Sequence, residues 1–149
     1  MSPLQQQLLD NIKVSMKARD IERVKVLRNV QSVIKQIEID RRVELDDAEV
    51  LDVLQKQLKQ RYESLSIFTA NDRHDLAQKE QFEIDIINEF MPKQMDNDEI
   101  IALVNTEIAK QGATSMRDMG AVMGALKVLT AGRADPAIIS KLLKQSLQG

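Results

Sequence analysis

The sequence predicts an all-α protein, and three of its features support this prediction. Gly and Pro are scarce, with five and three in 149 residues, and aromatic residues make up only 3%. Apolar residues recur at the spacing of one helix face in every long segment, and no segment alternates as a half-buried strand does. Turn-rich β proteins need more Gly and Pro than this chain has. The core is therefore expected to consist of Leu, Ile, Val and Met.

Four helices are expected in the first part of the chain. Ser2 and Pro3 begin the first, because a hydroxyl side chain caps a helix N-terminus and Pro fits its first turn. Asp46 and Glu49 give a similar capping signal before the third helix. The four helices are predicted to start near residues 3, 20, 46 and 75, and the third and fourth to end near residues 68 and 90.

Three shorter helices are expected after the segment MPKQMD. Pro92 lies in this segment and ends the fourth helix, since the residue before a Pro disfavours helical geometry. The break divides the chain into an N-terminal helical bundle, residues 1–92, and a C-terminal three-helix lobe, residues 93–149. The shorter helices are predicted over residues 97–110, 116–130 and 136–147.

An ion pair is predicted between the third and fourth helices. Folded back on each other, these helices pair residues whose numbers sum to about 141, which sets Arg61 opposite Glu80 where apolar residues are expected. Because either charge alone would be costly to bury, we interpret the two as a structural ion pair in preference to a catalytic one. Arg28, which follows Leu27 near the apolar stripe of the second helix, is a candidate third member.

Several kinds of chemistry find no support in the sequence. The chain has no Cys, which excludes thiolate metal sites and Cys nucleophiles, and its one His, His74, has no nearby Ser constellation. Glu80 and Glu83 are three apart, but the His of a di-iron Glu-x-x-His motif is missing. We therefore expect no metal, no cofactor and no catalytic centre.

The charge and hydropathy pattern bounds the location and the partners. No apolar run approaches the roughly 18 residues of a membrane span, and the N-terminal segment lacks the basic stretch of a signal peptide. We therefore expect a cytoplasmic protein with no membrane partner. The net charge is −2, yet from Gly112 onward five Lys or Arg residues face only two Asp residues.

The stretch DMGAVMGALK places two glycines, Gly120 and Gly124, on one face of a predicted helix. Gly in a helix interior costs about 1 kcal/mol relative to Ala, so this bare face needs a reason. We favour a close helix–helix crossing inside the lobe, because small residues permit short interaxial distances. The second interpretation is a ridge that receives an external partner, for which Lys127 and Arg133 at its far end suit a phosphate.

Longer motifs point to a known family. MKARD is followed in order by VLRNVQSVIKQIEI, QKQLKQRYES, NDRHDLAQKEQFEIDIINEFMPKQM, MGAVMG, GRADPAIIS and KLLKQSL. In this order they resemble the GatB/YqeY family, specifically the stand-alone YqeY-like proteins, over nearly the whole chain. The resemblance implies a two-lobed all-α fold whose C-terminal lobe is similar to the tail domain of GatB. GatB is a subunit of the amidotransferase that converts Glu-tRNA(Gln) or Asp-tRNA(Asn) to the amide.

In that enzyme the tail contacts the tRNA body and carries no catalytic residue. The resemblance also brings a family label, carbon–nitrogen ligase with glutamine as amide donor, which is inherited from the larger enzyme. Two departures stand out: Ala121 where relatives often have Lys, and Pro136 where stand-alone relatives often have Gly. Carried over position by position, the resemblance implies RNA contacts at Gly120, Gly124, Lys127 and Arg133, with Lys141 and Lys144 as electrostatic support.

Three functions are weighed on this basis. The leading hypothesis is a non-catalytic, tRNA-binding accessory module related to the amidotransferase. The alternative is a helical protein–protein interaction module that docks a partner helix on the Gly120/Gly124 face without binding RNA. An enzyme acting on amides or aminoacyl-tRNA is disfavoured, because no nucleophile–base pair or metal set can be assembled from these residues.

Overall fold

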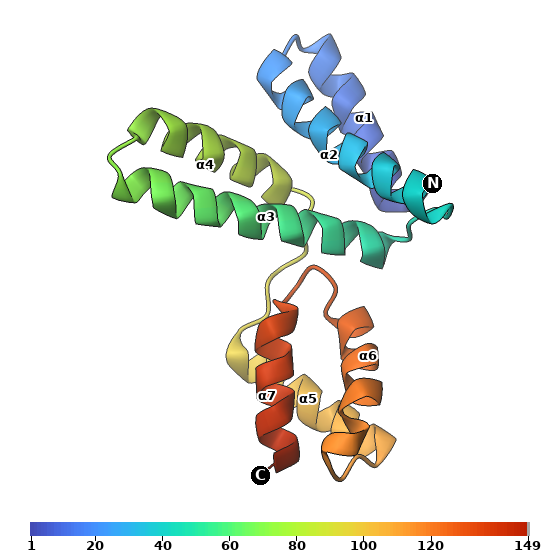
Figure 1. Cartoon of the computed structure of the whole chain (residues 1–149). Helices are drawn as coiled ribbons and strands as arrows, with labels where there is room; N and C mark the ends of the chain where they lie inside the picture. Colours follow the sequence, from blue (N-terminus) through green and yellow to red (C-terminus); the bar gives the residue numbers. More distant parts are fainter. Residues whose placement is uncertain (149) are drawn as a thin grey trace. The chain divides into compact units, whose positions relative to one another are not determined.

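The computed structural model describes residues 1–148 and confirms the all-α prediction (Figure 1). Within these residues the chain forms seven α-helices and one short 3₁₀-helix, and no strand. None of the helices is long and apolar enough to cross a membrane in the part of the chain that is described. The elements are α1 (Pro3–Lys17), α2 (Ile21–Arg41), α3 (Asp47–Ala70), α4 (His74–Asn88), α5 (Asn97–Gln111), η1 (Met116–Asp118), α6 (Met119–Leu129) and α7 (Pro136–Gln148).

Side-chain caps explain where most of these helices begin. The hydroxyl of Ser2 accepts a hydrogen bond from the backbone N–H of Gln5 at 3.2 Å, ahead of α1. Asp46 and Glu49 form a complete capping box at the start of α3. Asp96 accepts from the backbone N–H of Glu99 at 2.8 Å ahead of α5. Each cap satisfies a backbone donor that the helix itself leaves unpaired.

Residues 1–91 form one compact unit made of two helical hairpins, α1–α2 and α3–α4. Figure 1 shows α4 lying along α3, while α1 and α2 pack together and meet α3 near its N-terminal end. All four helices contribute buried side chains to one apolar core, and Leu27, Leu54 and Ile84 are completely buried in it.

The residues from Pro92 onward form a second compact unit with a core of its own. In it α5, α6 and α7 pack against one another around Val104, Leu126 and Ile139, which are fully buried. The incoming chain is tied to this unit, because the backbone N–H of Met95 donates to the carbonyl of Arg133 at 2.8 Å.

Among the element boundaries that differ from the sequence prediction, two matter for the site. α6 begins at Met119 and not at residue 116, because Ser115 and Asp118 form a capping box around the short η1 turn. α3 continues to Ala70, so the α3–α4 turn is centred near residue 72. The helix pairing is therefore shifted by about three residues from the register expected in the sequence.

Candidate RNA interface

The solvent face of α6 is bare around its two glycines. Val122 and Leu126 turn one side of the helix into the core, and Gly120 and Gly124 lie on the other side, exposed. A Cβ atom added at either glycine would meet nothing within 4 Å outside its immediate surroundings in the helix. The expectation of a close helix–helix crossing at these glycines is therefore wrong. No neighbouring helix approaches them, because Val122 and Leu126 provide the contact face.

The two glycines do not carry the same cost. Gly120 is the second residue of α6, where the helix is only beginning, whereas Gly124 is in its middle. Neither has the positive φ that would require glycine. Gly124 therefore weakens the helix by about 1 kcal/mol relative to Ala, and neither packing nor backbone geometry explains it.

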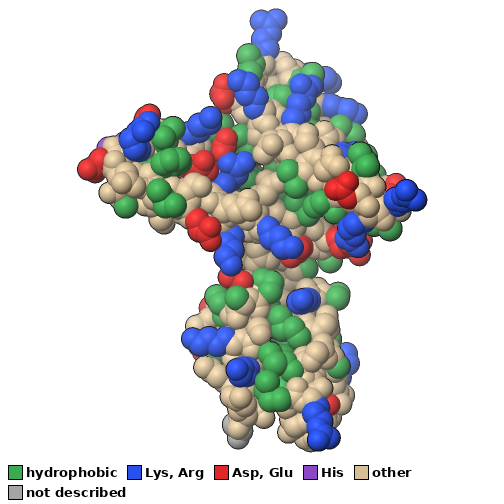
Figure 2. Space-filling model, viewed as in Figure 1, with side chains coloured by type: hydrophobic (Ala, Val, Ile, Leu, Met, Phe, Trp, Pro, Cys, Tyr) green, Lys and Arg blue, Asp and Glu red, His purple; other side chains and the backbone are tan. Residues whose placement is uncertain are grey.

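Three lysines lie on exposed faces of this unit. Lys127 follows Gly124 by three positions and shares its face of α6, while Lys141 and Lys144 lie on α7 away from the buried Ile139. No Asp or Glu among residues 1–148 pairs with any of the three. Figure 2 shows Lys and Arg side chains around an exposed hydrophobic area on the drawn face of this unit.

From Gly112 onward the chain has two acids, and both accept hydrogen bonds from backbone groups. Asp118 accepts hydrogen bonds from the backbone N–H groups of Thr114 at 2.9 Å and Ser115 at 3.3 Å. Asp135 accepts from the backbone N–H of Ala137 at 2.9 Å, at the start of α7. Both carboxylates serve helix caps, and neither forms an ion pair with Lys127, Lys141 or Lys144.

Arg133 has a different environment from the lysines. Its Nε donates to the carbonyl of Lys93 at 3.2 Å, and its Nη2 lies 4.0 Å from the carboxylate of Glu99. The guanidinium thus ties the segment before α5 to the α6–α7 turn. Of the predicted RNA contacts, Arg133 is the one whose side chain is engaged in holding the fold.

Arg61 lies in a charged cluster between α3 and α4. Its Nη1 is 3.5 Å from Glu80 and also bonds Glu83, and the three side chains are only 17%, 19% and 17% exposed. Glu83 was not predicted as a partner, because the turn was expected at residues 70–71 and lies one to two residues later, so that paired numbers sum to about 144 and not 141. The spacing of Glu80 and Glu83 was the available signal, since residues three apart share a helix face.

The expectation that Arg28 joins this cluster is wrong. Arg28 is exposed on α2, and its Nη2 lies 3.4 Å from the sulfur of Met16 on α1. Each residue step turns a helix by about 100°, so the position after the buried Leu27 points away from the core. The arginine of α2 that pairs with an acid near the end of α4 is Arg23, whose partner is the C-cap residue Glu89.

Two further polar features were missed in the sequence. The amide of Gln57, one helical turn before Arg61, is buried with no hydrogen-bond partner, and Arg61 Nε is likewise unpaired.

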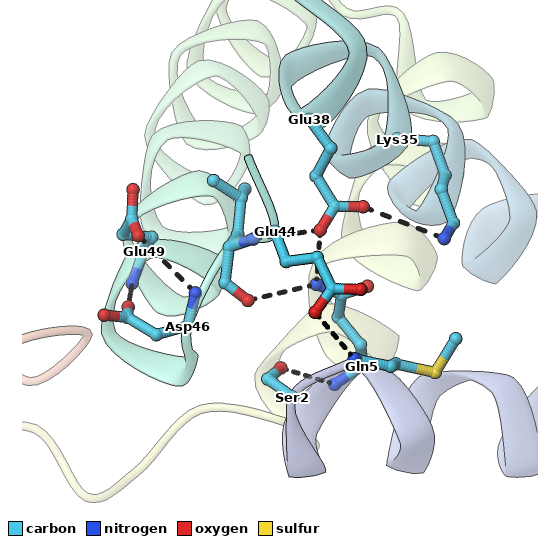
Figure 3. Close-up of polar contacts among 9 residues, drawn as sticks. Ser2, Gln5, Lys35, Glu38, Glu44, Asp46 and Glu49 are labelled. Carbon is cyan, nitrogen blue, oxygen red and sulfur yellow. Dashed lines mark hydrogen bonds and ion pairs between the residues drawn. The ribbon is translucent and has the colours of Figure 1, made fainter. Parts of the chain in front are cut away.

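Elsewhere, Glu38 joins α1, α2 and the start of α3 (Figure 3) by accepting hydrogen bonds from Leu45 N–H at 2.9 Å and the Gln5 amide at 3.1 Å. These bonds hold the pKa of Glu38 below its ordinary value of 4.5. A Glu in a helix carries no signal in the sequence that it will bridge three elements.

Potential metal ligands do not gather in the part of the chain that is described. No three His, Asp or Glu side chains among residues 1–148 form a group that could hold a metal ion. His74 is exposed at the start of α4, with Nε2 3.9 Å from Asp72.

Comparisons with known proteins identify relatives of this chain. The model of the family described as "Yqey-like protein" matches residues 5–147. Three yeast proteins named "Altered inheritance of mitochondria protein 41, mitochondrial" are similar to it. The protein from Candida glabrata is 32% identical over 70% of this chain and 59% of its own length. The protein from Vanderwaltozyma polyspora is 29% identical over 75% of this chain and 64% of its own length. The protein from Eremothecium gossypii is 38% identical over 56% of this chain and 46% of its own length. The chain thus covers less than two thirds of these relatives' own length.

Proposed function

The chain belongs to the YqeY-like protein family, and from that premise we propose that it is a small helical accessory protein that binds tRNA without a catalytic centre of its own. The resemblance to the GatB tail domain suggests this partner. A fold does not by itself transfer a function, so the proposal depends on one surface, the bare face of α6.

The single observation that carries the proposal is the open space over Gly124. A glycine in the middle of a helix lowers stability, and here no packed neighbour offsets that cost. A ligand with its own bulky backbone can approach a helix closely only where side chains are absent. The exposed Lys127 on the same face supplies a positive charge beside this opening.

Backbone recognition fits the composition of this unit. Aromatic residues make up only 3% of the chain, which offers few platforms for stacking bases. Lys127, Lys141 and Lys144 lack carboxylate partners within residues 1–148 and are free to meet phosphates. We infer recognition of the folded shape and phosphates of a tRNA, in preference to reading of bases.

The family label of carbon–nitrogen ligase with glutamine as amide donor belongs, in this proposal, to the larger amidotransferase. The names of the yeast relatives refer to the inheritance of mitochondria and to a mitochondrial location, and they state no reaction. The cytoplasmic location expected from the sequence stays a prediction.

The test is fluorescence anisotropy with a labelled tRNA and a labelled RNA duplex of equal length, at low and moderate salt. The wild type is compared with Lys127→Ala/Lys144→Ala, and Lys56→Ala/Lys59→Ala on α3 serves as the matched control. We expect preferential binding to tRNA that weakens with salt. In the Lys127→Ala/Lys144→Ala variant, the slope of log affinity against log salt concentration should become shallower by about one to two units. Each phosphate contact that is lost means that about one counterion fewer is released on binding.

Two results would overturn this function. One is equal affinity for tRNA and duplex, which would mean general attraction to phosphates. The other is an unchanged salt slope in the Lys127→Ala/Lys144→Ala variant, which would place the contact elsewhere.

One observation favours the alternative, a protein–protein interaction module. Val128 and Leu129 on α6 are exposed, at 69% and 49%, and apolar side chains beside a glycine face suit a partner helix. A Val128→Ser/Leu129→Ser variant separates the two functions. Loss of tRNA binding only with the lysine variant supports the RNA module, whereas a protein partner captured by the wild type and lost with the serine variant supports the alternative.

A further inference from the structure

The turn between α1 and α2 carries exposed apolar side chains at the end of a helical hairpin. Val14, Met16 and Ile21 are 65%, 51% and 65% exposed. Single exposed apolar residues are ordinary, but these three all lie within four residues of the turn at residues 18–20 and surround the hairpin end on more than one side. We define the basic turn as residues 13–21, at the top of Figure 1, where Figure 2 shows Lys and Arg beside hydrophobic side chains.

The cations of the basic turn have no acidic partners. Lys13, Lys17 and Arg19 are exposed, and no carboxylate among residues 1–148 pairs with them. The acid of the turn, Asp20, accepts from the backbone N–H of Arg23 as the N-cap of α2. Within residues 13–21 three Lys or Arg residues stand against one acid, in a chain whose net charge is −2.

Arg19 occupies a backbone position that favours glycine. Its φ is +58°, and the N–H groups of Arg19 and Asp20 close the end of α1 by donating to Met16 and Ser15 at 3.1 and 2.9 Å. Glycine adopts this left-handed position without strain and is the usual residue in such a motif. An Arg here places an exposed charge in the turn at some cost in stability.

We propose that the basic turn adsorbs to the surface of an anionic phospholipid membrane. Its cations meet the lipid phosphates while Val14, Met16 and Ile21 enter the boundary between headgroups and acyl chains. The exposed aliphatic side chains favour lipid over nucleic acid, because an RNA backbone would leave them in water. The shape favours lipid over a folded protein, since a projecting hairpin end enters a fluid interface without needing a matching hollow.

This proposal revises the expectation of no membrane partner. That expectation rested on the lack of a spanning segment, and adsorption to a membrane surface needs none. It is independent of the tRNA proposal, which concerns a different unit of the chain.

The test uses the whole protein and vesicles of phosphatidylcholine, with and without phosphatidylserine, and measures partitioning by flotation. The structure offers matched pairs of variants at the two ends of α2. Arg19→Gly has Arg42→Gly as its control, because Arg42 has nearly the same backbone conformation, with φ +55°. Ile21→Ser has Ile39→Ser as its control, because Ile39 is 68% exposed.

We expect the wild type to bind the anionic vesicles and not the neutral ones. Arg19→Gly should weaken partitioning about fivefold while leaving the fold intact, in line with the loss of one cation near the surface. Ile21→Ser should also weaken it severalfold, and both control variants should bind as the wild type does.

Three outcomes would overturn the proposal. The first is no binding of the wild type to anionic vesicles, and the second is equal loss in test and control variants. The third is loss of tRNA affinity in Arg19→Gly without any vesicle binding by the wild type, which would assign the basic turn to nucleic acid.

Discussion

At the scale of single residues, the Arg61 cluster gives the clearest prediction for the free energy of unfolding. Arg61→Met leaves Glu80 and Glu83 facing each other, each less than one fifth exposed, with no cation between them. Removal of one partner from a mostly buried ion pair is strongly destabilising, so we expect the free energy of unfolding to fall by about 2–4 kcal/mol. Urea denaturation at neutral pH measures this loss.

The matched variant for this prediction removes all three charges. Arg61→Met/Glu80→Leu/Glu83→Leu should recover most of the lost stability, because apolar residues of similar volume replace a buried ion pair at little cost. A triple variant that is less stable than Arg61→Met would contradict the ion-pair account.

Glu38 makes a second prediction at this scale, for the pH dependence of stability. Hydrogen bonds from Leu45 N–H and Gln5 keep its folded-state pKa below 4.5. As the pH falls, Glu38 of the unfolded chain therefore binds a proton at a higher pH than Glu38 of the folded protein does. The stabilisation is complete above the unfolded pKa and is lost as the pH drops through the folded one.

In thermal melts, Glu38→Gln should lower stability at neutral pH and flatten the decline between about pH 5 and pH 3 relative to the wild type. An unchanged slope in that interval would show that Glu38 does not carry the effect.

At the scale of helices, local signals predict most of the fold. Caps such as Ser2 and Asp46 act within a few residues, so they can be read from the sequence and they recur in the structure. The apolar period likewise predicts the seven helices that residues 1–148 form. Errors arise where two signals compete, as at η1, where the Ser115 cap starts a 3₁₀ turn ahead of α6.

The candidate site is less predictable than the fold because it depends on contacts between elements. The sequence marks Gly120 and Gly124 as unusual, but whether a helix packs on them depends on tertiary structure. Arg133 reads as a free cation in the sequence, and only the fold brings it to Lys93 and Glu99. The prediction for Arg28 failed for a similar reason, because a shift of one residue along a helix turns a side chain by about 100°, from the core toward solvent.

At the scale of the whole molecule, the chain divides into two units. Each unit buries its own core. Beyond Gly112 the two Asp side chains cap helices while lysines stay exposed, so a basic region exists in a chain that is acidic overall. We propose that the boundary near Pro92 separates two domains, of which the second carries the RNA-binding face of α6.

The most direct measurement of this claim is the tRNA affinity of Gly124→Leu together with its stability. A Cβ atom there meets nothing within 4 Å and the residue is exposed, so we expect the free energy of unfolding to rise by about 0.5–1 kcal/mol. Affinity for tRNA should fall by about tenfold or more, about 1.4 kcal/mol of binding, because the side chain fills the approach to α6. Ala102→Leu, on an exposed face of α5, is the control and should bind as the wild type does. If Gly124→Leu binds tRNA as tightly as the wild type, the bare face of α6 is not an RNA interface.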